Sequence, residues 1–441
     1  MKKEYIADCL ADYAKSNCVR LHMPGHKGNG KGILSEVYAY DVTELSFSDN
    51  LADPSGIIAM AEEDIAKICG AKRSRILTGG STLGVLSAIY AVKDRGKKLI
   101  IQRSSHKSVY NALELFGIQP LILNDCLKDG LITGEFSNDW LFDCADNDII
   151  GALLTSPDYF GRALNLKDIK QRLNKNGKLL LVDGAHGGHF VFDNPSCYAG
   201  NFADIWVDGA HKTLQTLTQG AVLNVNDLSL MDGVQKALSI FSTSSPSYLI
   251  MASVESGFKN FEEFKNQNLQ SFGEAKQILV GAIKDAGYEM LDGDDPLKVA
   301  FVCKNGQGNV ISENLEKAGI YAELASDGVV LFMLGYSFNK EQALRVEKVL
   351  KDNIYSGEQG VFENPSLPIR KTDYISAVKG ETELVDLSDA YGRVCAENAG
   401  VFPPCYPVIT AGEVFDNRVI KALLVKNTFG IQQGKVKVVK E

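Results

Sequence analysis

The stretch RILTGGSTLGVLSAIYAVKDRG, residues 75–96, contains a short apolar run, a glycine turn and an apolar segment of helical length. This order predicts a buried β-strand that leads through a tight turn into an α-helix. The stretch KLIIQRSSHKSVYNALELFG, residues 98–117, repeats the plan. Further apolar runs that end in polar residues lie within 149–161, 178–192 and 203–213. Buried runs that alternate with helices predict a mostly parallel sheet with helices on both faces.

The chain divides into four parts along its length. Its 441 residues correspond to two to four domains at roughly 100–200 residues each. We expect an N-terminal arm over 1–56, with an amphipathic helix at 4–16, and a large domain over 57–256. A long polar helical stretch opens a smaller α+β domain over 257–365. The last part, 366–441, contains a loop interrupted by prolines.

The composition excludes several classes of protein. The net charge is −9 and no long basic block occurs, which argues against a nucleic-acid partner. No apolar run approaches the about 18 residues of a membrane helix. Glu4, Asp8 and Asp12 interrupt the region where a signal peptide would be apolar. The nine cysteines are scattered without a Cys-x-x-Cys pair, as reduced thiols are. We therefore expect a soluble cytoplasmic protein.

The motif TGGSTLG, residues 78–84, follows the first predicted strand and opens a helix. A helix N-terminus offers free backbone N–H groups and a positive dipole end, and Ser81 and Thr82 add hydroxyl donors. The motif lacks the glycine spacing of a dinucleotide site and the Gly-Lys-Ser/Thr of a P-loop. It is therefore consistent with a lone phosphate group or, equally, with a capped helix after a tight turn.

The segment VDGAHGGHF, residues 182–190, ends an apolar run with Asp183. A buried carboxylate needs a partner, or its pKa rises. Asp183, His186 and His189 are conceivable metal ligands, but their spacing matches no common zinc pattern, and we expect no metal. The two glycines favour close approach of the backbone to a flat ligand.

Lys212 follows the next predicted strand, in ADIWVDGAHKT. A lysine in this place is more often a solvated charge than a reactive amine. Here, however, a buried aspartate ends the preceding strand, and His106 follows a third strand in QRSSHKS. A phosphate cup, a flat ring, a carboxylate and an amine together suit pyridoxal 5′-phosphate, which needs a lysine for its Schiff base and an acid at its pyridinium nitrogen.

Several motifs in order resemble the Orn/Lys/Arg decarboxylase family, pyridoxal-phosphate enzymes of the aspartate-aminotransferase-like fold (fold type I). The matching segments are LHMPGHKG (21–28), DVTEL (41–45), TGGSTLG (78–84), SSHKSVYNAL (104–113), TSPDYFG (155–161), VDGAHGGH (182–189), DGAHKTL (208–214) and TSSPSYLIMASVE (243–255). A weaker match, PPCYPVITAGE (403–413), lies in the tail. The order of independent motifs makes the resemblance specific for the family but not for the substrate.

The resemblance implies a role at the cofactor for five residues, of which Lys212, Asp183, His106 and His211 would be catalytic and His186 would bind the cofactor. Lys212 would form the Schiff base with the cofactor. Asp183 would keep the pyridine nitrogen protonated, and His106 would stack on the ring. His186 would lie near the ring and its 3-hydroxyl, and His211 would lie close to the cofactor.

The resemblance also implies a phosphate site and a homodimer. Ser81 and Thr82 would bind the phosphate of the cofactor. Thr243 or Ser244 would reach the phosphate of a neighbouring subunit, because active sites of the family lie at a dimer interface. The two subunits would then share their active sites.

The implied reaction is decarboxylation of lysine, arginine or ornithine to CO2 and cadaverine, agmatine or putrescine. Lys212 or His211 would return a proton to the α-carbon. The distal cation of such a substrate calls for an acidic side chain, for which Glu44, Asp49 and Glu413 are candidates. Asp49 is the weakest of them, since it suits a capping carboxylate.

Three features depart from the family pattern. Relatives often carry a serine three residues before the Schiff-base lysine, where this chain has Gly209. Cys405 and Tyr406 replace residues of a PPGIP-like segment. The response-regulator-like domain of the large bacterial members is not found in the sequence, so the small members are the better comparison.

Three other functions remain open. An aminotransferase or lyase of the same fold would use an arginine for the substrate carboxylate, and the chain has Arg345, Arg370, Arg393 and Arg418 after residue 257, none in a recognisable context. A degenerate relative without activity would explain Gly209 and the altered tail. A Rossmann oxidoreductase would need the glycine fingerprint that the chain lacks.

Overall fold

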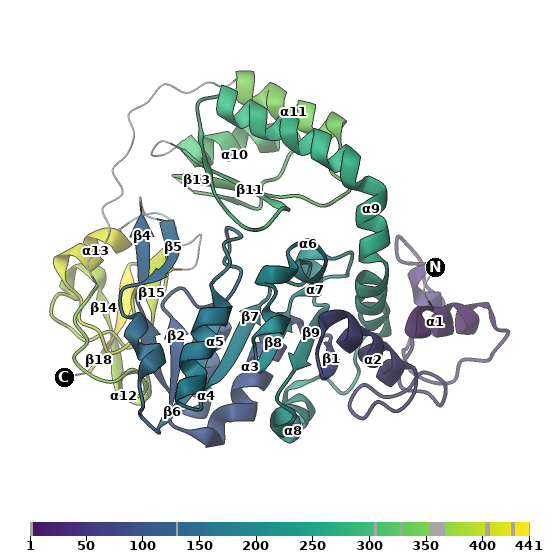
Figure 1. Ribbon diagram of the computed structural model, residues 1–441, viewed down its shortest axis with the longest axis horizontal. Helices are drawn as coiled ribbons and strands as arrows, with labels where there is room; N and C mark the ends of the chain where they lie inside the picture. Colours follow the sequence, from purple (N-terminus) through teal and green to yellow (C-terminus); the bar gives the residue numbers. More distant parts are fainter. Residues whose placement is uncertain are drawn as a thin grey trace.

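The computed structural model describes residues 3–128, 131–303, 307–326, 328–352, 367–401, 406–424 and 428–440. Figure 1 shows three regions: a large domain around a central sheet, a smaller domain above it, and a C-terminal segment at the side of the sheet. This arrangement confirms the predicted α/β architecture of a mostly parallel sheet with a smaller α+β domain.

The central sheet has seven strands. Their order is β1 (Arg73–Leu77), β9 (Ala221–Val225), β8 (Ile205–Asp208), β7 (Leu179–Gly184), β6 (Ile149–Thr155), β2 (Lys98–Gln102) and β3 (Gln119–Leu123). All of them run in the same direction except β9, which is antiparallel to both neighbours. The sequence did not reveal this reversal, because a fully apolar run fits either direction.

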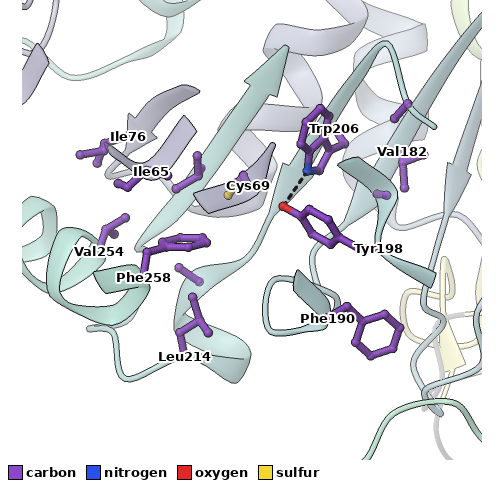
Figure 2. Packing of buried hydrophobic residues seen from close by; sticks show 14 of the residues in the cluster. Ile65, Cys69, Ile76, Val182, Phe190, Tyr198, Trp206, Leu214, Val254 and Phe258 are labelled. Carbon is purple, nitrogen blue, oxygen red and sulfur yellow. Dashed lines mark hydrogen bonds between the residues drawn. The ribbon is translucent and has the colours of Figure 1, made fainter. Parts of the chain in front are cut away.

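Helices cover both faces of the sheet because successive strand residues point to opposite sides. Val182 and Trp206 belong to one core, whereas Leu181 and Val207 belong to the other. The first core, part of which Figure 2 shows, contains residues of α1 (Tyr5–Lys15), α2 (Ile57–Cys69), α5 (Leu166–Lys175) and α9 (Tyr248–Asp285). The second contains residues of α3 (Gly80–Val92), α4 (Lys107–Phe116), α8 (Met231–Phe241) and α12 (Tyr374–Lys379).

The N-terminal arm is anchored through α1, close to the helix predicted at 4–16. The buried carboxylate of Glu255, in α9, accepts hydrogen bonds from the backbone N–H groups of Tyr5 at 2.6 Å and Ile6 at 2.8 Å. These groups have no partner inside the helix, so the carboxylate satisfies donors that would otherwise be buried alone. Lys259 Nζ lies 2.9 Å from Glu255 Oε1 and balances its charge.

Helix α9 runs for 38 residues and joins the large domain to the small one. The boundary expected at 257 falls inside this helix, whose first half packs on the central sheet and whose second half contributes Leu279 and Ile283 to the small-domain core. That domain has a four-stranded sheet in the order β10 (Glu289–Leu291), β11 (Lys298–Val302), β13 (Val329–Met333) and β12 (Leu324–Ala325). It also holds α10 (Gln307–Lys317) and α11 (Lys340–Asp352).

The C-terminal segment forms small antiparallel sheets beside β2 and β3. They pair β14 (Thr382–Asp386) with β18 (Lys435–Val439), and β15 (Ala399–Val401) with β16 (Tyr406–Ile409) and β17 (Thr428–Phe429). Helix α13 (Asn417–Leu423) packs on them. Further elements of the chain are the β4–β5 hairpin (Asp125–Lys128, Leu131–Phe136), α6 (Phe190–Asp193), α7 (Ala210–Thr213) and 3-10 turns at Val37–Ala39, Lys93–Arg95, Asp139–Asp143, Pro195–Cys197, Ala199–Asn201, Leu228–Leu230 and Leu387–Asp389.

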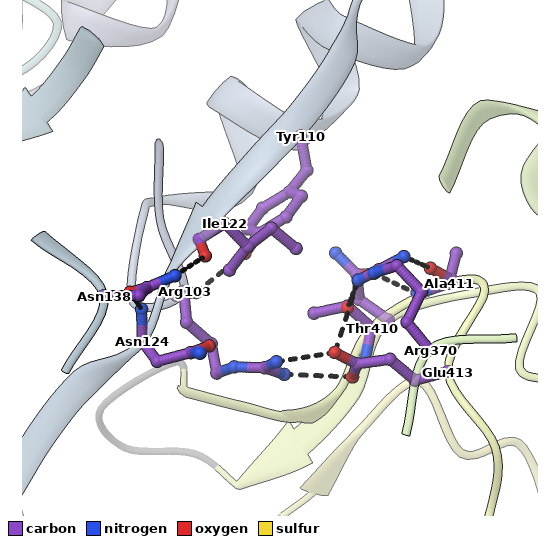
Figure 3. Close-up of polar contacts among 10 residues, drawn as sticks. Arg103, Tyr110, Ile122, Asn124, Asn138, Arg370, Thr410, Ala411 and Glu413 are labelled. Carbon is purple, nitrogen blue, oxygen red and sulfur yellow. Dashed lines mark hydrogen bonds and ion pairs between the residues drawn. The ribbon is translucent and has the colours of Figure 1, made fainter. Parts of the chain in front are cut away.

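A buried ion pair fastens this segment to the large domain (Figure 3). Arg103, just after β2, donates to Glu413 through Nη2 at 2.6 Å and Nη1 at 3.0 Å. Both side chains are 3% exposed. Arg370 Nη2 lies 3.3 Å from the same carboxylate. The two-pronged geometry is the strong form of this interaction, so Glu413 is bound within the fold.

Candidate active site

The carboxyl ends of the parallel strands bring the predicted site residues together. Thr155, at the end of β6, lies opposite Asp183 of β7, and Gly184 lies opposite Asp208 of β8. His106 follows β2, and the charges of Asp183 and Lys212 both act on it. Ligand sites of open α/β sheets lie at this edge.

Lys212 lies in the single helical turn α7, directly after β8. Its Nζ is 3.0 Å from Nε2 of His186. Burial lowers the pKa of Lys212, while the carboxylates of Asp183 and, more weakly, Glu323 raise it. A partly buried amine with a lowered pKa is more often neutral, and the neutral form is the nucleophile.

His186 is a buried, neutral ring. Burial lowers its pKa well below the ordinary value, and the positive charges of Lys298 and Lys212 act in the same direction. Its Nδ1 is buried without a hydrogen-bond partner in the described part of the chain. Tyr159 packs edge-on against this ring, with 5.1 Å between the centroids. The ring is therefore held between a phenol and an amine.

His189 does not join this group. Its Nε2 lies 2.8 Å from Asp295 Oδ1 of the small domain, and both side chains are fully buried. The described residues contain no cluster of three or more histidine, cysteine, aspartate or glutamate side chains that could hold a metal ion. The conceivable metal set of Asp183, His186 and His189 is thus not assembled in this part of the chain.

Asp183 is 4% exposed and accepts a hydrogen bond from the backbone N–H of Ala185 at 3.2 Å. Its carboxylate acts electrostatically on both His106 and Lys212. A carboxylate in this position can accept a hydrogen bond from a protonated ring nitrogen of a ligand that lies between these groups.

His106 caps helix α4. Its Nδ1 accepts a hydrogen bond from the backbone N–H of Ser108 at 3.2 Å, and the Ser108 hydroxyl lies 2.8 Å away. Partial burial lowers the pKa of His106, the charge of Asp183 opposes this, and Lys212 adds to it. The residue as a whole is exposed. The contacts with Ser108 hold the ring at the start of α4, and its stacking on a cofactor stays a prediction.

The start of α3 is the candidate phosphate cup. The Ser81 hydroxyl is buried without a hydrogen-bond partner among the described residues, whereas Thr82 is exposed. The N–H of Gly80, the first residue of this 13-residue helix, donates to the carbonyl of Gln219 at 2.8 Å, whereas the next N–H groups have no intrahelical partner. Gly84 brings the helix close to the sheet, because a Cβ there would lie 2.7 Å from Val207 Cγ1. An unpartnered hydroxyl beside the helix N–H groups that follow Gly80 fits a phosphate.

The residues around position 209 explain why it is a glycine. A Cβ at this position would lie 2.4 Å from the carbonyl oxygen of Ala185 and 2.8 Å from Ser81 Oγ. The backbone before Lys212 thus passes directly over the cup, and the Ser81 hydroxyl occupies the space where a serine at 209 would extend. The departure from the family pattern is therefore compatible with a phosphate site.

His211 and the turn before α9 lie at the margin of the group. His211 Nδ1 is 2.8 Å from the carbonyl oxygen of Gly220, which ties α7 to the start of β9. Thr243 and Ser244 are exposed, and Thr243 Oγ1 lies 3.4 Å from Ser245 Oγ. In the described residues they make no contact with Lys212 or Asp183, so a role toward a neighbouring subunit stays a prediction.

The three acidic candidates for the substrate cation have different environments. Glu413 is occupied by Arg103 and Arg370, which argues against its expected role. Asp49 caps α2: burial raises its pKa, and hydrogen bonds from the backbone N–H groups of residues 50, 55, 56 and 58 lower it overall. Glu44 is partly buried and accepts a hydrogen bond from Thr43 Oγ1 at 2.6 Å.

Sequence reasoning missed Tyr159, Lys298 and Glu323 as residues near Lys212. Tyr159 lies in the TSPDYFG motif, which was noted only for the resemblance. The small-domain residues carried no signal, because their approach to the site depends on how the two domains pack. Tyr406 is buried beside Arg103 and Asp125, and Cys405 lies outside the described residues.

Family models match most of the chain. The model described as Orn/Lys/Arg decarboxylase, major domain, matches residues 6–278, and the one described as the C-terminal domain of the same family matches residues 361–432. The chain belongs to the Orn/Lys/Arg decarboxylase family. This family membership confirms the resemblance that the motifs indicated.

Characterised and uncharacterised relatives agree with this membership. An uncharacterised Bacillus subtilis protein, YaaO, is 32% identical over 92% of this chain and 90% of its own length. An arginine decarboxylase of Halalkalibacterium halodurans is 28% identical, with 95% and 92% covered. The constitutive lysine decarboxylase of Escherichia coli is 23% identical, with 92% and 74% covered.

Solved structures share the fold. The structure of the Escherichia coli constitutive lysine decarboxylase has a TM-score of 0.80 at 20% identity and covers 99% of this chain and 82% of its own. A serine palmitoyltransferase of S. paucimobilis with bound PLP has a TM-score of 0.55 at 15% identity, with 70% and 80% covered. These likenesses confirm fold type I. Within the described residues, no helix has the length and apolarity to cross a bilayer.

Proposed function

We propose that the chain is a pyridoxal-phosphate-dependent carboxy-lyase that converts lysine, arginine or ornithine to CO2 and the corresponding amine. The observation that carries this proposal is the grouping of the Lys212 amine, the Asp183 carboxylate and the unpartnered Ser81 hydroxyl at one edge of the sheet. Membership in the decarboxylase family supports the reaction class.

Each residue has a distinct task in holding the cofactor. Lys212 would supply the amine that attaches it, Asp183 would accept the N–H of its ring, and His106 would lie beside the ring. Ser81, Thr82 and the N–H groups of α3 that follow Gly80 would bind its phosphate. When bound, pyridoxal phosphate supplies an aldehyde that joins a primary amine and a ring that accepts the electron pair left by departing CO2.

Two groups are placed to return a proton to the α-carbon. Lys212 Nζ would carry a transferable proton, and its lowered pKa eases the release of that proton. His211 shares the proton at Nδ1 with the Gly220 carbonyl, which leaves Nε2 as its second site. His186 Nε2 contacts Lys212 Nζ at 3.0 Å and so restrains its position.

The aminotransferase alternative lacks a free arginine in the small domain or tail. Arg345 donates a hydrogen bond to the carbonyl of Ala318, and Arg370 forms an ion pair with Glu413. Arg393 pairs with Glu383 and Arg418 with Asp416. None of these four contacts a residue of the Lys212 group, which supports a carboxy-lyase over a transaminase.

A homodimer with shared active sites is part of the proposal. The N-terminal arm exposes many large apolar side chains: Val19, Leu21, Met23, Ile33, Leu34, Val37, Tyr40 and Phe47. An exposed apolar surface of this kind marks a protein interface. Size-exclusion chromatography with light scattering should give twice the chain mass.

The proposed reaction is tested by CO2 release. Purified protein reconstituted with pyridoxal phosphate is given lysine, arginine or ornithine separately, and release from one of them is expected. Turnover that depends on a ketoacid would instead favour the aminotransferase. A protein that binds no cofactor after reconstitution would favour a degenerate relative.

A further inference from the structure

A groove runs along the outer edge of the central sheet. Strand β3 is the last strand there and pairs with β2 alone. Between β3, the turn Asp139–Asp143 and the start of the C-terminal segment lies a space of about 320 Å³, which Arg103, Arg370 and Glu413 help to line. This volume is at the lower end of the range for small-molecule pockets. Of the described residues that line the groove, none belongs to the Lys212 group.

The edge of β3 is closed to a further strand. Because Gln119 and Leu123 bond to the backbone next to β2, the alternate residues Pro120 and Ile122 direct their backbone groups outward. Pro120 has no N–H, and its carbonyl accepts a hydrogen bond from Gln119 Nε2 at 3.4 Å. The carbonyl of Ile122 accepts one from Asn138 Nδ2 at 3.0 Å. An added peptide strand would need these groups, so the groove suits a small molecule instead.

The unpartnered polar groups around the groove are hydrogen-bond donors. Trp140 is 61% exposed, and neither its indole N–H nor the side-chain amide of Asn124 forms a hydrogen bond within the described residues. Arg370 uses Nη1 and Nη2 for its contacts in that part of the chain, which leaves its Nε. Tryptophan and arginine side chains can only donate. A ligand therefore has to bring acceptor atoms.

The groove lining has one more positive than negative charge. Arg103 and Arg370 both pair with Glu413 (Figure 3). The two oxygens of that carboxylate already accept hydrogen bonds from Arg103, at 2.6 and 3.0 Å. Asp125 also acts on Arg103, but it does not line the groove, and it accepts hydrogen bonds of 3.0 Å from the N–H and the hydroxyl of Ser104. An anionic ligand would thus meet guanidinium groups and a carboxylate that is already paired.

The rest of the lining is largely apolar. It includes Pro120, Leu121, Leu141, Leu367 and Pro368. Apolar walls that carry a few donor groups are typical of sites for organic molecules with one polar end.

We propose that the groove binds a small organic carboxylate with a flat apolar body. The carboxylate accepts hydrogen bonds from Arg370 and Asn124, and the body packs against Trp140. A free amino acid or an amine would bring a cation to the two guanidinium groups and is disfavoured. The groove is therefore distinct from the place of substrate and product in the proposed reaction, and the inference does not depend on that reaction.

Tryptophan fluorescence can report the binding, because the chain has two tryptophans and Trp206 is fully buried. We titrate the holo-protein with phenylacetate and with phenylacetamide, its neutral analogue of the same shape, and follow the same titrations by calorimetry. Phenylacetate should bind at least about tenfold more tightly, since the amide lacks the charge. Trp140→Phe should remove the change in emission and keep a measurable heat of binding.

Two substitutions test the polar contacts. Asn124→Asp should weaken the binding of phenylacetate at least about tenfold by charge repulsion, and the fold should persist because the amide has no partner to lose in the described residues. Arg370→Gln should weaken binding by a similar factor. Arg418→Gln is the matched control, because Arg418 is an exposed arginine of the same segment that does not line the groove. Unchanged binding in both Asn124→Asp and Arg370→Gln would overturn the proposal.

Three other results would overturn it as well. Equal affinity for phenylacetate and phenylacetamide would indicate an apolar surface without an anion site. Inorganic phosphate that binds as tightly as phenylacetate would indicate an unspecific anion patch. Neither heat nor a change in emission with phenylacetate, together with poor quenching of Trp140 by acrylamide, would indicate that a second copy of the chain covers the groove. These titrations do not measure CO2 release, so their outcome is separate from that of the carboxy-lyase proposal.

Discussion

The amine of Lys212 lies 3.0 Å from Nε2 of His186 at the carboxyl edge of the central sheet. Burial lowers the pKa of both groups. The contact therefore joins a neutral imidazole to an amine that gives up its proton more readily than a free lysine. This relationship is the chemical centre of the site and can be tested without any assumption about the substrate.

The lowered pKa of Lys212 should appear in amine labelling of the cofactor-free protein. We expect Lys212 to react with an acylating reagent at lower pH than Nα-acetyl-lysine amide does, because the neutral amine forms at lower pH. Mass spectrometry of labelled peptides across pH 6–10 measures this. A labelling midpoint equal to that of the model amide would contradict a lowered pKa.

Substitution of Lys212 and substitution of Asp183 should each stop the reaction, but in different ways. Lys212→Ala should abolish CO2 release, since it removes the amine that would attach the cofactor. Asp183→Asn should retain cofactor but lose most activity, because an amide does not keep the ring nitrogen protonated. Cofactor content by absorbance and CO2 release separate the two effects. Near-full activity of Lys212→Ala would refute the role of this amine.

Gly209→Ser should weaken cofactor binding, although a serine there matches the family pattern. Its Cβ would meet the Ala185 carbonyl and Ser81 Oγ, and the shift needed would distort the cup. We expect the dissociation constant of pyridoxal phosphate to rise about tenfold, which equals about 1.4 kcal/mol. Gly273→Ala, in α9, is the control, because nothing lies within 4 Å of its added Cβ. Tighter binding of pyridoxal phosphate by Gly209→Ser would contradict this expectation, because the residues around Ser81 would then have to move apart to admit the new side chain.

Glu413→Gln should destabilise the protein rather than change its substrate preference. The substitution leaves Arg103 buried without its counter-charge, a change that typically costs about 3–5 kcal/mol. Urea unfolding measures the loss. The ratio of kcat/KM among arginine, lysine and ornithine should stay as in the wild type. If KM rose for only one of the three amino acids and stability did not change, Glu413 would instead be a substrate-binding residue.

Asp208 should make stability depend on pH. Burial raises its pKa to about 7, while hydrogen bonds from Tyr198, Trp206 and Asn224 oppose the rise. A carboxyl with a higher pKa in the folded than in the unfolded state binds more protons when folded, so its contribution to stability falls as pH rises from about 4 to 7. We compare the free energy of unfolding of Asp208→Asn with that of the wild type at each pH. From pH 5 to pH 8 this difference should change by about 2–4 kcal/mol in favour of Asp208→Asn. A constant difference between the two pH values would exclude this effect.

Local patterns predicted much of the fold. The strand–turn–helix units at 75–96 and 98–117 became β1–α3 and β2–α4, because their periodicity and glycines act over a few residues. The residues at the strand ends met as expected, since parallel strands share one edge. The reversed direction of β9 and the continuity of α9 across 257 were missed, because both depend on tertiary packing.

The site was predicted from its large-domain side only. Asp183, His186 and Lys212 lie in glycine-bearing motifs directly after strands, so their positions could be inferred. Glu323 and Lys298 come from another domain, and nothing in their local sequence marks them. Glu413 lies in a segment that resembles the family, and this suggested a role at the substrate. Its carboxylate pairs with Arg103 instead, a long-range contact that no local pattern encodes.

Helix α9 has a mechanical consequence. At about 1.5 Å per residue its 38 residues extend roughly 57 Å, with one end in each domain core. A hinge between the domains would have to bend this helix, which contains no proline, and the Ser256-Gly257 pair at the predicted boundary is the place where it would bend. Because one continuous helix contributes to both cores, the two domains should melt together in a single calorimetric transition. The hydrogen bond between Tyr159 and Glu323 is a further connection between the two domains.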